Sequence, residues 1–191
     1  NSNISSSYNG WIDLFGWGTS GWNCGNTYYR PWDSNVNDAF YGPQGNNNLT
    51  GAYAHSDWGV HNAIDNGGNS AGQWRTLTEE EWSYILNRNT ASGICFAKAK
   101  VNGVNGLILL PDNWSGNYYT LNNTDEVEAN YSGNVISSST WINSLEKHGA
   151  VFLPVAGERY GTTISYLYDY PHGYYWSSTS SSNDNRRAIA L

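Results

Sequence analysis

The sequence contains no methionine, few charged residues, two cysteines and no long apolar run. Charged side chains make up 13% of the 191 residues, about half the usual share in soluble proteins. No apolar run approaches the roughly 18 residues that a membrane-spanning helix needs. Aromatic residues make up 15%, which argues against a disordered chain. We therefore expect one folded domain with its own core and no membrane span.

The acidic charge balance excludes one class of partner. The net charge is −7 and the isoelectric point is near 4.8, which disfavours binding to the phosphate backbone of nucleic acids. The nearest approach to a basic patch is the pair Arg186-Arg187. Glycine, tyrosine and tryptophan are abundant instead, at 21, 15 and 10 residues. Because Tyr, Ser, Gly and Asn dominate many binding surfaces, the composition favours a secreted binding protein and no nucleic-acid partner.

The two cysteines, Cys24 and Cys95, leave two interpretations open. They lie 71 residues apart, so a disulfide formed in an oxidising compartment would close a long loop and stabilise the fold. The alternative is two free, buried thiols, because the dense cysteine framework of small secreted domains is missing. Their spacing suits no zinc site. The chain begins at Asn1 without a signal peptide, so we interpret it as a mature product, a trimmed fragment or an incomplete sequence.

The first 73 residues are rich in turn-forming residues. Gly, Asn and Asp recur every few positions with Trp and Tyr between them, as in Gly16-Trp17-Gly18 and Asp57-Trp58-Gly59. This pattern is incompatible with a row of long helices. We expect irregular loops and short strands pinned by aromatic anchors, with Asn46-Asn47-Asn48 as an exposed loop tip.

A helix is predicted to start at Thr78. Thr78 and Glu81 have the spacing of a capping box, and the acidic residues between them suit the positive end of the helix dipole. Trp82, Ile85 and Leu86 recur at helical spacing and would share one face. The helix should end near residues 87–89.

A β-hairpin is predicted directly after this helix. Residues 96–101 and 104–110 flank Asn102-Gly103, a pair that accepts the positive φ angles of a type I′ turn. Ile108-Leu109-Leu110 is apolar without alternation, so we expect that strand to be buried on both faces, and Pro111 ends it.

A second helix is predicted after a polar loop over residues 112–136, in which Trp114, Tyr118 and Tyr119 act as anchors. It runs from about Thr140 to Lys147. We expect Ser138 or Ser139 to cap it and Gly149 to end it. The residues that would face inward are Trp141, Ile142 and Leu145.

Short strands complete the predicted fold. Ala150 to Leu153 reads as a buried strand closed by Pro154, and residues 155–171 read as a glycine- and tyrosine-rich loop. Tyr174 to Thr179 and Arg187 to Leu191 read as the last two strands. The sequence contains no internal repeat and no linker. The order of elements predicts an α+β fold in which two helices pack on small antiparallel sheets, with extensive irregular loops.

Several segments together resemble the C-type-lectin-like fold, in its formylglycine-generating-enzyme branch. The chain is similar to variable proteins of diversity-generating retroelements and to related lectin-like surface proteins of gut Bacteroidales and their phages. The similarity extends over nearly the whole chain, although one fold hosts many functions. The segments that carry it are Trp11 to Gly21, Trp74 to Trp82, Ala97 to Gly106, Val151 to Pro154 with Gly157, and Gly173 to Thr179.

The resemblance implies a ligand-binding face near the C-terminus. In the retroelement proteins, the Trp-Ser-Ser strand is constant framework and the loop after it is the diversified contact surface. By that likeness Trp176, Ser177 and Ser178 should pack inward. The predicted contact residues are Tyr168, Asp169, Tyr174, Ser180, Ser181, Ser182, Asn183, Asp184, Asn185, Arg186 and Arg187.

The resemblance also sets expectations for the domain and its setting. We expect one C-type-lectin-like domain over residues 1–191, shortened at its C-terminus relative to the family, with a shortened N-terminus as an open alternative. The expected location is extracellular, on a phage tail or a bacterial cell surface. The expected partner is a host-cell surface protein or glycan. Alternative partners are neighbouring subunits of a virion or fimbria.

No catalytic group, metal or cofactor is expected. Enzymes of the resembled branch use paired C-terminal cysteines with copper, whereas the last 96 residues here contain none. His55 and His61 lie near Asp57 and Asp65, but we interpret them as solvated loop histidines rather than metal ligands. Asp112-Asn113-Trp114 reverses a lectin calcium motif and reads as a turn after Pro111. Arg75 and Arg159 read as buried structural arginines, with an acidic ligand as the alternative.

Overall fold

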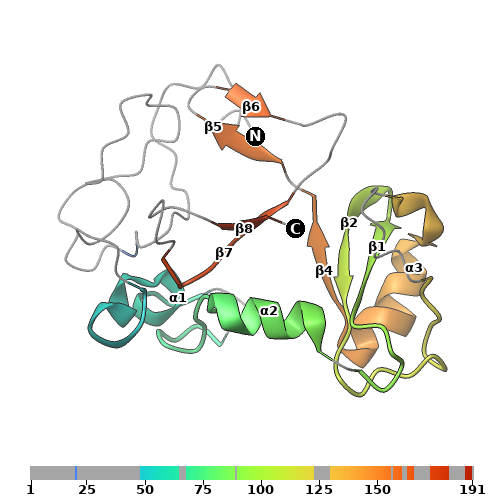
Figure 1. The fold of residues 1–191 in the computed structure, drawn as a ribbon, viewed down its shortest axis with the longest axis horizontal. Coiled ribbons are helices and arrows are strands. Elements are labelled where there is room, and N and C mark those ends of the chain that lie inside the picture. The colour runs from blue at the N-terminus through green and yellow to red at the C-terminus, as the bar shows by residue number, and fades with distance from the viewer. Residues whose placement is uncertain are drawn as a thin grey trace. The chain divides into compact units, whose positions relative to one another are not determined.

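The computed structural model has a mixed α+β fold (Figure 1). The chain packs as two compact units, which are described separately below. The first unit comprises residues 1–79, 158–165 and 175–189, and the second comprises residues 80–157, 166–174 and 190–191. The structure describes residues 20, 48–64, 68–88, 90–122, 130–155, 157–160, 163–165, 173–180 and 188–190.

The second unit is built on a four-stranded sheet in the order β3-β1-β2-β4. The strands are β1 (Phe96–Val101), β2 (Val104–Leu109), β3 (Val135–Ile136) and β4 (Val151–Pro154). β1 pairs antiparallel with β2 but parallel with β3, so the prediction of a purely antiparallel sheet is wrong. The short strand β3 was missed because two residues carry no periodic pattern of their own.

The predicted hairpin is confirmed between β1 and β2. Asn102 and Gly103 have φ angles of 48° and 82°, and Val101 pairs with Val104 across them. Both turn residues therefore adopt the left-handed conformation that a two-residue hairpin needs, which Asn and Gly tolerate best.

The core of the second unit lies around β2, which has neighbours on both sides. Ile108 and Leu110 are fully buried, as the unalternated apolar run predicted. Gly106 is also required in this strand, since a Cβ there would lie 2.4 Å from the Phe152 ring and 2.5 Å from the Leu153 carbonyl oxygen. The close approach of β4 to β2 therefore depends on a residue without a side chain.

The edge position of β4 corrects the prediction of a buried strand. Val151, the first residue of β4, is 53% exposed, whereas the preceding Ala150 is buried. The Val155 N–H donates to the Asn105 carbonyl at 2.8 Å, so the bonds to β2 fall on alternate residues 151, 153 and 155. Pro154 lies between two of them, where the ladder with β2 needs no N–H. This is why a proline is tolerated inside the strand.

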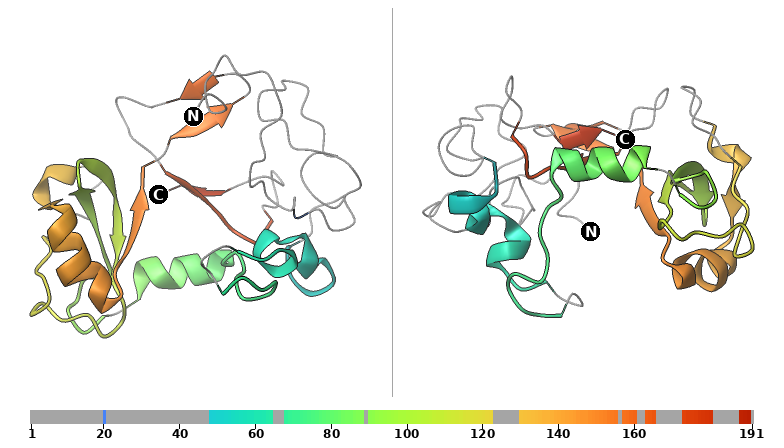
Figure 2. Two further views of the ribbon diagram at one scale, coloured as in Figure 1. Left: turned by 180° about the vertical axis from the view of Figure 1, so that it is seen from behind. Right: turned by 60° about the horizontal axis from the view of Figure 1, so that its bottom comes forward.

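A single helical segment covers one face of this sheet (Figures 1 and 2). It comprises α3 (Ser138–Thr140), a π turn (Trp141–Leu145) and a 3-10 turn (Glu146–His148). The N-cap is Ser137, whose Oγ accepts from the Thr140 N–H at 3.1 Å, not Ser138 or Ser139. Gly149 ends the segment with a φ of 89°, as predicted.

The π turn overturns one predicted packing contact. Leu145 is fully buried and Trp141 packs edge-on against Phe152, but Ile142 is 54% exposed. The Glu146 N–H donates to the Trp141 carbonyl five residues earlier, so the turn holds more residues than an α-helical turn. The spacing of 3.6 residues used for the prediction therefore fails here, and Ile142 turns outward.

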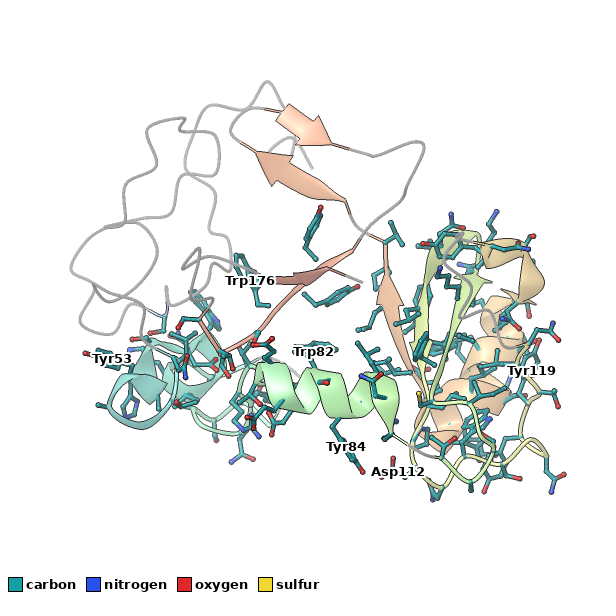
Figure 3. All side chains as sticks on the ribbon, in the orientation of Figure 1. Tyr53, Trp82, Tyr84, Asp112, Tyr119 and Trp176 are labelled. Carbon is teal, nitrogen blue, oxygen red and sulfur yellow. The ribbon has the colours of Figure 1, made fainter. Side chains whose placement is uncertain are left out.

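Helix α2 (Glu79–Asn87) has the predicted bounds. Trp82 is buried and Tyr84 is 60% exposed, and Figure 3 shows them on opposite sides of the helix. Ile85 and Leu86 are half-buried. After the helix, the Arg88 guanidinium donates to the carbonyls of Ile85 and Leu110 and pairs with Asp112, so it ties the end of α2 to the end of β2.

Of the three aromatic anchors predicted in the loop after Pro111, only Trp114 is fully buried. Trp114 is 2% exposed and belongs to the core, and its N–H donates to the Pro111 carbonyl at 3.0 Å, which confirms the predicted turn. Tyr118 is instead 40% exposed, with its ring stacked on His148 at a centroid distance of 3.9 Å. Tyr119 is half-buried and packs against the core.

The first unit contains short elements. In its described part, a 3-10 helix (Gly51–Ser56) and α1 (Trp58–His61) replace the short strands predicted for this region. The strands β5 (Glu158–Tyr160) and β6 (Thr163–Ser165) pair antiparallel inside a predicted loop, so that prediction is wrong in part. β7 (Tyr174–Trp176) and β8 (Ala188–Ala190), of which residues 175–176 and 188–189 belong to this unit, form the predicted C-terminal pair, and both strands are shorter than expected.

Candidate functional site

The structure describes two of the predicted contact residues. Tyr174 lies on β7 in the second unit and is 39% exposed. Ser180 follows β7 in the first unit and is half-buried. The remaining predicted contact residues lie outside the described residues: Tyr168, Asp169, Ser181, Ser182, Asn183, Asp184, Asn185, Arg186 and Arg187.

The residues just before Ser180 form a polar segment, which we call the serine frame, with two buried residues (Ser177 and Ser178) and one half-buried residue (Thr179). Ser177 and Ser178 are 3% and 1% exposed, so their predicted inward packing is confirmed, while Trp176 is half-buried. The Ser178 N–H donates to the Leu77 carbonyl at 2.8 Å, and its carbonyl accepts from the Leu49 N–H at 2.8 Å. The frame therefore lies between two segments that are distant in sequence.

Thr179 joins the serine frame to the start of α2. Its Oγ1 accepts from the Glu79 N–H at 3.0 Å, and its own N–H donates to the Ser177 Oγ at 3.0 Å. The first N–H groups of a helix have no partner within the helix, so a hydroxyl from elsewhere in the chain satisfies one of them here. The position of residue 179 is consequently fixed by the helix start.

Ser180 is held by a residue that the sequence did not single out as functional. Both the N–H and the Oγ of Ser180 donate to the Asn48 Oδ1, at 2.9 and 3.0 Å. Asn48 is exposed, as predicted for a loop tip, but its side chain is engaged. The two residues are 132 positions apart, and no local pattern in the sequence indicates such a contact.

A buried carboxylate supports the segment that pairs with the frame. Asp57 is 1% exposed, and its oxygens accept from the N–H groups of Gly59 and Thr76 at 3.1 and 2.6 Å. The Thr76 hydroxyl adds a third contact at 3.3 Å. A buried carboxylate is tolerated only when such donors compensate its lost hydration. Thr76 is thereby fixed next to Leu77, the residue that bonds Ser178.

The hydrogen bonds of Asp57 also bear on the metal site that was considered from the sequence at His55, His61, Asp57 and Asp65. The oxygens of Asp57 face backbone and hydroxyl donors, and the exposed rings of His55 and His61 meet edge-on with centroids 6.2 Å apart. Asp65 lies outside the described residues. Within the described part of the chain, no group of three or more His, Cys, Asp or Glu side chains is placed to hold a metal ion.

Asp112 and Cys95, which were weighed from the sequence as a calcium ligand and as a disulfide partner, both have hydrogen-bond partners within the second unit. The Asp112 carboxylate pairs with Arg88 and accepts from the Tyr84 hydroxyl at 3.4 Å, and Figure 3 shows Tyr84 projecting toward it. Cys95 is a free thiol whose Sγ donates to the Leu86 carbonyl at 3.2 Å, and Cys24 lies outside the described residues.

Neither arginine singled out from the sequence is shown to be a buried structural residue. Arg75, in the first unit, is exposed, so its assignment as a buried residue is wrong. Its guanidinium donates to the Thr76 carbonyl at 3.3 Å, which is a local contact on the protein surface. The side chain of Arg159 lies outside the described residues.

Tyr175 on strand β7 is half-buried. Burial raises the pKa of Tyr175 to about 12 from 10.0, because a phenolate loses hydration in this environment. The Tyr175 side chain is therefore a neutral phenol throughout the physiological range. Any recognition by this strand would use apolar and hydrogen-bonding contacts rather than a tyrosinate charge.

Comparison of the chain with protein-family models, with curated proteins and with solved structures finds no match. Among the helices of the described residues, none has the length and apolar character needed to cross a membrane.

Proposed function

We propose that this chain is a ligand-binding module of C-type-lectin-like fold, displayed outside the cell on a phage tail or a bacterial surface. Its ligand is a host-cell surface protein or a glycan, and it carries no catalytic activity. The contact residues are those of the loop over residues 180–187, which we call the contact loop, together with Tyr168, Asp169 and Tyr174. The proposal rests on the resemblance of the sequence and on the arrangement of the residues that precede this loop.

The observation that carries the proposal is the fixed position of the serine frame. Leu49 and Leu77 hold Ser178 from two sides, and Glu79 holds Thr179. An ordinary exposed hairpin turn needs no such support, because its register comes from its own two strands. A loop that must present side chains in one arrangement benefits from it, since ordering the contact surface before binding lowers the entropic cost of association.

The composition of the contact loop suits recognition by hydrogen bonds. Its serines, asparagines and arginines can donate and accept without a large apolar area, and Tyr174 adds a partly exposed aromatic ring. Polar, adaptable residues with aromatic anchors are typical of protein surfaces that bind varied ligands. The acidic charge of the whole chain favours neutral or cationic ligands over phosphate polymers.

The test is replacement of residues 181–187 by a Gly-Ser segment of equal length, which leaves the serine frame and Ser180 intact. The fluorescently labelled chain is applied to a printed glycan array and to intact Bacteroidales cells. We expect the variant to lose binding while its thermal unfolding midpoint stays that of the wild type. A control variant, Asn113→Ser with Asn117→Ser, changes an exposed loop of the second unit and should bind normally. Binding that survives the replacement would show that the contact residues lie elsewhere.

A structural subunit of a virion or fimbria is the second candidate, and exposed apolar residues favour it. Val135 and Val151 are 65% and 53% exposed on the two edge strands of the four-stranded sheet, and Ile142 is 54% exposed on the helical segment. Exposed apolar side chains mark a subunit interface when they are covered together as one contiguous patch, which is what this candidate requires of these three residues. A stable complex that forms through these residues and leaves the contact loop accessible would favour this candidate over ligand binding.

An oxidase of the formylglycine-generating type is a weaker candidate. Its copper chemistry needs paired cysteines, whereas Cys95 donates its thiol to the Leu86 carbonyl. Titration with Cu(I) separates the two functions, because a binding module should show no stoichiometric, thiol-dependent copper uptake.

A further inference from the structure

We infer that Asn48 is a positioning residue for the contact loop: its side-chain oxygen fixes Ser180, the first residue of that loop, without contributing to the core. This inference rests on the proposed function, because it assigns a role in binding to a residue that lies outside the predicted contact residues. The observation behind it is the double hydrogen bond from Ser180 to Asn48.

The geometry of this contact restrains Ser180 in two ways. Asn48 Oδ1 accepts from the Ser180 N–H at 2.9 Å, which fixes the backbone where the chain enters the contact loop. The same oxygen accepts from the Ser180 Oγ at 3.0 Å, which selects one orientation of the hydroxyl. A carbonyl oxygen has two lone pairs and can accept both bonds at once. Loss of this one atom therefore releases both restraints.

The backbone next to Asn48 is held independently of its side chain. Leu49 is 4% exposed, and its N–H donates to the Ser178 carbonyl at 2.8 Å. This bond remains when the Asn48 side chain is shortened. Because Asn48 itself is exposed, no core volume is lost either. Asn48 thus differs from Ser178, whose burial makes any substitution a test of folding as well as of positioning.

The chemistry of the contact predicts which substitutions are tolerated. Asn48→Asp keeps an acceptor oxygen in the same place and should retain both bonds from Ser180, whereas Asn48→Ala removes the acceptor. The asparagine amide nitrogen is dispensable, because both contacts with Ser180 use the oxygen. A purely steric role would instead treat alanine and aspartate as equally disruptive or equally harmless.

The first measurement is amide hydrogen exchange at Ser180, followed by NMR in the free protein. We expect Asn48→Ala to speed exchange of this amide and Asn48→Asp to leave it near the wild-type rate. The control is Asn117→Ala, an exposed asparagine in the second unit that should change nothing at Ser180. Equal exchange rates in the wild type and Asn48→Ala would overturn the inference.

The second measurement is binding to the same glycan array and intact cells. We expect Asn48→Ala to bind roughly tenfold more weakly if Ser180 keeps its wild-type position about a tenth of the time in this variant, and Asn48→Asp to restore the affinity. The unfolding midpoint should barely change. If the wild type binds and Asn48→Ala binds equally well, the inference about Asn48 is overturned, but the proposed function still stands. Absence of binding by the wild type on both probes overturns the proposed function, and the binding role of Asn48 falls with it.

Discussion

The two compact units differ in the balance of apolar and polar side chains that they bury. The second unit has an apolar core, in which Ala97, Ile108 and Leu145 are fully buried between the sheet and the helical segment. Among its described residues the first unit buries mainly polar groups, such as Asp57 and Ser177, with Leu49 as a buried apolar residue. The second unit buries one polar side chain of this kind among its described residues, Asn134. Apolar burial is insensitive to direction, whereas buried polar groups need partners at defined distances and angles.

Precise positioning of single atoms in this chain comes from polar contacts rather than from apolar burial. The apolar core stabilises the second unit, but because apolar burial is not directional, it does not fix the rotamers of exposed side chains. The polar contacts of the first unit fix single atoms, as the bonds to Ser178 from both sides illustrate. A contact loop that starts from such a segment begins at a defined place.

The largest effect is expected in the core of the second unit. Ile108→Ala removes a fully buried side chain from the central strand and should lower the free energy of unfolding by about 4 kcal/mol, through lost apolar burial and the cavity left behind. Urea denaturation measures it. Val104→Ala is the matched control on the same strand, because Val104 is 46% exposed and its loss should cost little. Equal losses from both substitutions would contradict the assignment of the core.

A smaller effect is expected from the buried carboxylate of the first unit. Asp57→Ala leaves the N–H groups of Gly59 and Thr76 buried without their acceptor and should lower the free energy of unfolding by about 3 kcal/mol. Amide hydrogen exchange should also rise at Thr76. If unfolding were unaffected and Thr76 stayed protected, the polar contacts would be incidental and the contrast between the units would fail.

Gly149 tests the end of the helical segment. Its φ of 89° lies in the left-handed region, so Gly149→Ala should cost about 1 kcal/mol, measured by urea denaturation. A Cβ at this position meets no atom closer than 3.6 Å, so the cost comes from the backbone and not from a clash. The control is Gly116→Ala, for which an ordinary van der Waals contact with the Thr120 Oγ1 at 3.9 Å and an ordinary φ predict a neutral result. A neutral Gly149→Ala would contradict the assigned C-cap.

The smallest effect is a pH dependence from one tyrosine in each unit. Burial raises the pKa of Tyr175 in the first unit to about 12 from 10.0, and it also raises the pKa of Tyr131 in the second unit. Between pH 10 and 12 the folded chain therefore binds more protons than the unfolded chain, so stability falls as the pH rises and is unaffected below this window.

Two phenylalanine variants separate the two tyrosines. Tyr175→Phe should flatten the loss of stability in this window, because the phenol that titrates is gone. Tyr131→Phe should flatten this loss less, since the pKa of Tyr175 is raised further than that of Tyr131. Urea denaturation from below pH 10 up to pH 12 measures both slopes. A steeper slope in Tyr175→Phe than in the wild type would contradict the direction of the shift.

The sequence predicted the elements that local chemistry determines. The turn at Asn102-Gly103, the start of α2 after Thr78 and the glycine C-cap at Gly149 all follow from backbone preferences that single residues express. The inward packing of Ser177 and Ser178 came instead from the resemblance, and burial of both residues agrees with it.

What the sequence did not predict depends on contacts between distant residues. Strand β3 forms through pairing with β1, and the π turn arises where the helical segment meets the sheet, which turns Ile142 outward. The partnership of Asn48 with Ser180 spans 132 positions, so no window of local sequence contains it. Of the candidate contact residues, Ser180 belongs to this second class, because hydrogen bonds to a distant segment fix it.

The most direct test of ligand binding by the C-terminal region is hydrogen–deuterium exchange of the whole chain with and without a glycan or cell-surface protein that it captures. We predict that the ligand protects peptides covering residues 173–191 and leaves the exchange of β1 and β2 unchanged. Protection confined to the four-stranded sheet, with no change over residues 173–191, would contradict this account of the molecule.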